Sequence, residues 1–160
     1  MDLNKLTLGD RVIAISGFLY LIFMFFPWYG LDFDGFHPSR NGWHYFLAWI
    51  ALILVIAMVA QIAIARFTDT KLPDLGSLTW GQVHVIAAGL ATLLVLLRVL
   101  IRDKVGGIFD HGLSRKYGLF LAFLAILGVL AGALLKLREP EVAAPPPPAA
   151  PPPPPPPPTA

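Results

Sequence analysis

Residues 43–65 read WHYFLAWIALILVIAMVAQIAIA, and this stretch decides the class of protein. It contains no Asp, Glu, Lys or Arg, and a helix needs about 17 to 25 apolar residues to cross a hydrocarbon core. Residues 12–28, 83–101 and 117–137 form three further apolar segments. They lack the apolar–polar alternation of barrel strands, and only helices and closed barrels satisfy their backbone in lipid. The sequence therefore predicts an all-α fold, an integral membrane four-helix bundle.

The composition of the whole chain agrees with this class. Of its 160 residues, 56% are hydrophobic and 14% are charged, against roughly 25% charged in a soluble domain. The absence of cysteine excludes disulfides, thiol catalysis and zinc–thiolate sites. A net charge of +2 does not indicate a nucleic-acid partner. The first apolar segment ends in Pro27-Trp28-Tyr29-Gly30 without a small-x-small cleavage site, which favours a retained helix over a cleaved signal peptide.

The chemistry of the chain changes after Glu139. Residues 145–148 and 151–158 are all proline, which cannot continue a helix or a sheet ladder. We expect a transmembrane domain over residues 1–139 and a disordered proline-rich tail over residues 140–160. The tail is either a polyproline ligand for an aromatic groove or a low-complexity extension.

Four spans place both termini on the same side of a plasma membrane. Each side carries six basic residues, so the count does not decide the orientation. The first helix usually dominates, and Lys5 and Arg11 against the lone Arg40 favour cytoplasmic termini. Aromatic residues flank the spans and are expected to anchor them at the membrane interface: Trp28, Tyr29, Trp43, Tyr45 and Trp80.

An internal similarity appears when the chain is shifted by 72 residues. The shift aligns Leu6-Thr7-Leu8-Gly9 with Leu78-Thr79-Trp80-Gly81, and Gly17 with Gly89. Each threonine can cap a helix N-terminus. The pattern indicates either a duplicated helical hairpin, with the two glycines in equivalent places, or chance similarity between apolar helices.

Ionisable residues in apolar spans are the first functional candidates in a membrane protein. Arg98 lies late in the third span, and it can snorkel to the interface, bind an anionic lipid headgroup or pair with an acid. Asp32 and Asp34 leave the membrane on the same side, so we predict that Arg98 or Arg102 contacts one of them. This contact would fold the first loop over the third helix.

Two other polar residues lie near span ends. His84 is either a proton-responsive group or an interfacial histidine, and Gln61 is expected either to form an interhelical hydrogen bond or to be exposed at the interface. In the fourth span Gly128 and Gly132 have the spacing that lets two helices approach closely. Their contact is either inside the bundle or with a second copy of the chain.

The sequence offers no enzyme site. Asp32, Asp34, His37 and His44 match no metal-ligand template, and no serine has a recognisable base. We therefore expect no catalytic group, no metal and no cofactor.

Three short motifs carry a family resemblance: FFPWYG (residues 25–30), NGWHYF (residues 41–46) and LLRVLIRD (residues 96–103). In these the chain resembles small uncharacterised actinobacterial membrane proteins with four transmembrane helices. The resemblance covers about residues 9–138 and implies no activity or cofactor. It leaves two functional readings: a non-enzymatic scaffold or accessory subunit acting through protein or lipid contacts, including a homo-oligomer, and a small transporter or channel.

Overall fold

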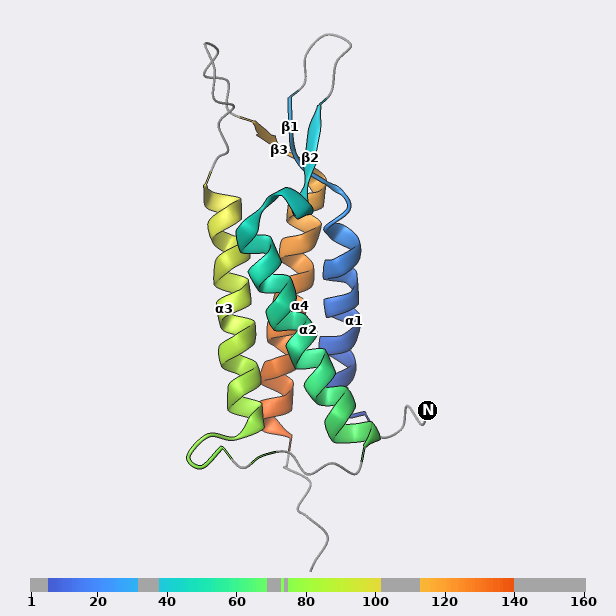
Figure 1. The fold of residues 1–160 in the computed structure, drawn as a ribbon, viewed down its shortest axis with the longest axis vertical. Helices are drawn as coiled ribbons and strands as arrows, with labels where there is room; N and C mark the ends of the chain where they lie inside the picture. Colours follow the sequence, from blue (N-terminus) through green and yellow to red (C-terminus); the bar gives the residue numbers. More distant parts are fainter. Residues whose placement is uncertain (1–5, 32–37, 69–72, 74, 102–112, 140–160) are drawn as a thin grey trace, which may run out of the picture.

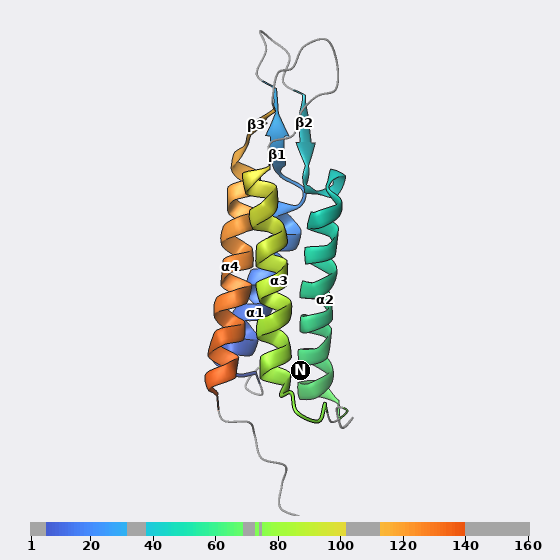
Figure 2. The same ribbon diagram turned by 90° about the vertical axis from the view of Figure 1, so that its left-hand side faces the viewer.

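The computed structural model describes residues 6–31, 38–68, 73, 75–101 and 113–139. These residues are mostly helical. The elements in chain order are α1 (Leu8–Phe23), β1 (Pro27–Gly30), β2 (Ser39–Asn41), the 3-10 helix η2 (Gly42–His44), α2 (Phe46–Phe67), α3 (Trp80–Leu100), β3 (Ser114–Arg115) and α4 (Tyr117–Arg138). The four α-helices lie side by side, with the small sheet at one end and the start of α1 at the other (Figures 1 and 2).

Three of these helices are long and apolar enough to cross a membrane: α2, α3 and α4. Their outward faces carry large exposed hydrophobic side chains, for example Ile53, Ile86 and Leu124. Helix α1 has 16 residues and therefore spans only about 24 Å. Among the described helices it does not meet the length of a membrane-spanning segment.

The first helix ends at Phe23, whereas the sequence predicted a span over residues 12–28. Proline disfavours helical geometry in the residue before it, and Pro27 opens strand β1. The indole Nε1 of Trp28 donates to the Phe23 carbonyl at 2.8 Å, and Gly42 N donates to the Met24 carbonyl at 2.9 Å. These bonds satisfy carbonyls that the helix leaves open at its C-terminal end.

A three-stranded sheet of order β2-β1-β3 closes this end of the helices. Strand β1 pairs antiparallel with both neighbours, so Tyr29 lies opposite Arg40 on one side and Arg115 on the other. The expectation of an all-α fold did not include this sheet. Strands of two to four residues are too short to give a periodic sequence signal.

Helix α1 packs most extensively against α4, and glycines make this close approach geometrically feasible. A Cβ atom on Gly132 would lie 2.8 Å from the backbone N of Ile13, and one on Gly9 would lie 2.8 Å from the backbone N of Lys136. A Cβ on Gly128 would meet the side chain of Ser16. Gly128 and Gly132 thus lie in a contact between two helices of the same chain.

The two helices of the proposed repeat begin alike but pack differently. Thr7 and Thr79 each cap their helix in a full capping box, as the sequence predicted. The expectation that Gly17 and Gly89 occupy equivalent places is wrong. A Cβ on Gly17 would clash with Val55 at 2.7 Å, whereas one on Gly89 would meet nothing within 4 Å.

Candidate functional site

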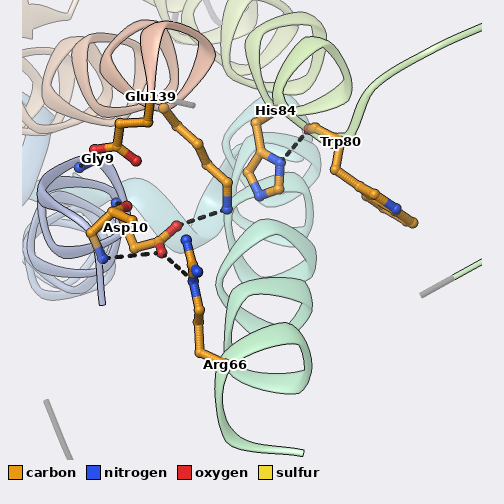
Figure 3. Close-up of polar contacts among 8 residues, drawn as sticks. Gly9, Asp10, Arg66, Trp80, His84 and Glu139 are labelled. Carbon is orange, nitrogen blue, oxygen red and sulfur yellow. Dashed lines mark hydrogen bonds and ion pairs between the residues drawn. The ribbon is translucent and has the colours of Figure 1, made fainter. Parts of the chain in front are cut away.

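A buried carboxylate lies where α1 begins. The Asp10 side chain is fully buried, and it takes part in the capping box because its Oδ2 accepts from Thr7 N at 3.3 Å. Lys136 Nζ on α4 donates to Asp10 Oδ1 at 2.7 Å, and Arg66 Nε on α2 donates to Oδ2 at 2.8 Å. Figure 3 shows these contacts converging on Asp10. One carboxylate therefore joins the ends of three helices.

The charges around Asp10 decide its ionisation. Burial by itself raises the pKa of the Asp10 carboxyl, but the hydrogen bonds and positive charges of Lys136 and Arg66 outweigh that effect. The net pKa of Asp10 is lower than that of an ordinary aspartate. Asp10 is therefore ionised at neutral pH, and the group contains two cations around one anion.

Glu139 adds a second link between α1 and α4. Its Oε1 accepts from Gly9 N, a first-turn backbone donor of α1, at 2.9 Å. Such donors have no partner within their own helix, and a negative charge near a helix N-terminus is favourable. The C-cap residue of α4 thus satisfies a free backbone donor at the N-terminus of α1.

His84 brings the third helix to this group (Figure 3). Its side chain is buried, and its Nδ1 lies 2.7 Å from the Trp80 carbonyl. A carbonyl only accepts, so Nδ1 carries the hydrogen and Nε2 presents a lone pair when the ring is neutral. The ring lies beside the Met58 backbone and within reach of the charges of Lys136 and Asp10. Among the described residues, neither the buried Nε2 nor the buried Oε1 of Gln61 on α2 has a hydrogen bond of ordinary geometry.

We define the basal cluster as Asp10, Arg66, His84, Lys136 and Glu139. It contains at least one polar side chain from each of the four α-helices, and it lies at the end of the helices opposite the sheet. Sequence reasoning singled out His84 but missed Asp10. The signal was present: an aspartate three residues after a capping threonine, at the start of an apolar segment, needs a buried or capping role.

A second group of polar and aromatic side chains lies next to the sheet, at the opposite end of the helices from the basal cluster. Arg98 is buried, and its guanidinium carbon lies 3.9 Å from the ring centroid of Tyr45 and 5.0 Å from that of Tyr29. These are cation–π contacts. The Tyr29 hydroxyl donates to the Arg98 carbonyl, which ties strand β1 to the end of α3. Arg98 is therefore held by aromatic rings, a contact that the sequence did not predict.

The expected partners of Arg98 lie outside the described residues. Asp32, Asp34 and Arg102 belong to segments 32–37 and 102–112, of which nothing is described. The contact between Arg98 or Arg102 and these acids remains a prediction.

The aromatic residues expected as interface anchors divide into two groups. Trp28 and Tyr29 are fully buried and Tyr45 is 7% exposed. The rings of Trp28 and Tyr45 are stacked, with their centroids 6.0 Å apart. Buried rings do not reach lipid headgroups, so the expectation is wrong for these three. Trp28 and Tyr29 lie in strand β1, and the Tyr45 ring packs against both of their rings. Trp43 and Trp80 are half-buried, as an interface anchor would be.

No protein-family model, curated protein or solved structure matches this chain.

Proposed function

We propose that this chain is a multi-pass plasma-membrane protein, with all four helices crossing the bilayer, that acts without catalysis as a scaffold or accessory subunit. Three helices qualify as spans by length and composition. The shorter α1 lies beside α4 at one side of the four helices, and it also exposes large apolar side chains, such as Ile15 and Phe18, which suit contact with lipid. The proposal includes cytoplasmic termini and a proline-rich tail that serves as a docking segment. The resemblance to small actinobacterial tetraspan proteins supports the same location.

The distribution of buried polar groups is the observation that favours a scaffold over a transporter or channel. Among the described residues, the buried charged and histidine side chains are Asp10 and His84 at one end and Arg98 at the other. The interior between them is made of small and apolar residues, such as Ala51, Val95 and Ala125. A permeation path needs polar or water-filled lining through the whole bilayer. The chemistry of this interior therefore suits a packed anchor.

The exposed surface is where such a protein makes contacts. Large apolar side chains cover the outward faces of α2, α3 and α4, and apolar surface of this kind serves lipid and partner helices alike. Polar chemistry gathers at the ends, at the depth of headgroups and of loops from partner proteins. The proposed mechanism is accordingly that the packed helices anchor the chain in the membrane, while the polar residues at their ends contact lipid headgroups and partner proteins.

Two measurements test this proposal together. The full chain is purified in mild detergent, and its retained partners are identified by mass spectrometry. The same preparation is placed in liposomes and assayed for ion and proton flux. We expect a stoichiometric membrane-protein partner and no flux above that of empty liposomes.

A matched variant sharpens the test of the tail. Deletion of residues 140–160 is expected to release a tail-bound partner while the helices still fold, because the tail begins after α4 ends at Arg138. A lone protein that carries flux would overturn the scaffold proposal in favour of transport. Recovery of the chain in the soluble fraction would overturn the membrane location itself.

A further inference from the structure

We propose that Arg66 and Lys136 form a binding site for one phosphate group of an anionic lipid headgroup, beside the buried Asp10. The inference rests on the proposed membrane location and names a specific ligand for one end of the molecule.

Within the described part of the chain, most of the hydrogen-bonding capacity of the two cations is unused. Arginine has five N–H donors and lysine has three. Arg66 gives its Nε hydrogen to Asp10, and Lys136 gives one Nζ hydrogen to the same carboxylate. Among the described residues these are the only hydrogen bonds that either side chain makes. The Nη atoms of Arg66 and two hydrogens of Lys136 therefore have no acceptor there.

The carboxylate between them accepts only three hydrogen bonds and leaves most donors of the two cations unused. Asp10 Oδ1 accepts from Lys136, and Oδ2 accepts from both Arg66 and Thr7 N. Glu139 brings a second carboxylate to this end of the helices, but its Oε1 accepts from Gly9 N and not from either cation. Among the described residues, several donors of Arg66 and Lys136 therefore have no acceptor, and a phosphate would supply one.

The surroundings of these donors favour a ligand over bulk water. Only 22% of the Arg66 side chain and 13% of the Lys136 side chain are exposed, so water reaches them from a narrow range of directions. The Nη atoms of Arg66 are nevertheless not sealed inside the molecule. They can be reached by a ligand that approaches the end of the helices.

The chemistry and position of the pair both select a phosphate. A guanidinium is a planar fork that matches two phosphate oxygens, and an ammonium adds a compact charge. Both residues lie in the last turn of an apolar helix long enough to span a membrane. Basic pockets between such helices lie at headgroup depth and bind anionic headgroups. A free phosphate has the same chemistry, but the position favours a lipid.

The test measures lipid retention on the full chain in mild neutral detergent by native mass spectrometry. Phosphatidylglycerol carries a phosphodiester with a net negative charge and free hydroxyls, and phosphatidylcholine carries a phosphodiester without net charge. We expect preferential retention of phosphatidylglycerol. Arg66→Gln should weaken that binding about tenfold, which corresponds to the loss of one charge-assisted contact.

Two further variants keep the test decisive. Arg138→Gln removes an exposed cation from the same last turn of α4 and should leave lipid retention within about twofold, since only an unspecific attraction is lost. Arg66→Lys keeps the charge next to Asp10 and loses the fork, so a folded R66K protein should still bind phosphatidylglycerol more weakly than the parent. It replaces R66Q if that variant does not fold.

The opposite results are equally clear. Equal retention of the two lipids would overturn the proposal, as would equal losses in R66Q and R138Q. A further experiment adds inorganic phosphate to the lipid-bound protein. If millimolar phosphate displaces phosphatidylglycerol and stabilises the parent protein as much as the lipid does, the ligand is a free anion and the proposal of a lipid headgroup is refuted. A membrane-embedded protein with its partner but no lipid preference would refute only this inference and leave the proposed function standing.

Discussion

Replacement of Asp10 by asparagine tests the basal cluster directly. Asparagine keeps the size of the side chain and one carbonyl oxygen, but it removes the charge that Lys136 and Arg66 share at 2.7 and 2.8 Å. A hydrogen bond to a charged group contributes about 1.5–3 kcal/mol, and loss of one partner of a buried ion pair costs about 3–5 kcal/mol. Both cations keep some exposed surface and can rehydrate, so we expect a loss of about 2–3 kcal/mol in the free energy of unfolding.

The assay is reversible unfolding of the purified chain in detergent, followed by tryptophan fluorescence during titration with a denaturing detergent. A double-mutant cycle with Lys136→Gln isolates the interaction between Asp10 and Lys136 from the other contacts of each residue. The coupling energy between D10N and K136Q should be about 1–2 kcal/mol, within the range of residues in one network. Arg138→Gln, an exposed neighbour in the same turn of α4, is the control and should change stability by less than about 0.5 kcal/mol. If D10N costs no more than this control, or if D10N and K136Q are additive, the cluster does not hold the helix ends together.

Three further predictions concern stability. Gly132→Ala places a methyl group against the backbone of Ile13 and should destabilise the chain by about 1–3 kcal/mol, whereas Gly89→Ala meets open space and should gain up to about 1 kcal/mol in the same assay. Equal effects of the two would contradict the α1–α4 contact. The pKa of Asp10 is lowered in the folded chain, so its contribution to the free energy of unfolding is complete above the unfolded pKa near 3.9 and is lost as the pH falls below it. A D10N protein should therefore lose less stability than the parent over that acid range. Identical pH profiles of the two proteins would argue against the ion pairs. Thr79→Ala removes a side-chain cap on the α3 N-terminus and should cost about 1 kcal/mol, a value that circular dichroism melting of the variant can check.

The sequence by itself determined the helices that qualify as spans. The lengths of apolar segments and the threonines that cap α1 and α3 are local features, so they can be read without knowing what packs against them. The glycine spacing of α4 also indicated a close helix contact. It could not identify the partner, because α1 and a second copy of the chain offer the same kind of surface.

Tertiary structure alone decided the site. Asp10 meets Arg66 and Lys136 across 56 and 126 residues of chain, and no sequence period connects such distant positions. The same holds for the rings of Tyr29 and Tyr45 around Arg98, which the sequence placed at a lipid interface. Their burial depends on a sheet whose strands are too short to show in the sequence, and on a proline that ends α1 early. Local sequence determines which segments become helices, whereas the packing of distant segments against one another determines which charged side chains are buried together.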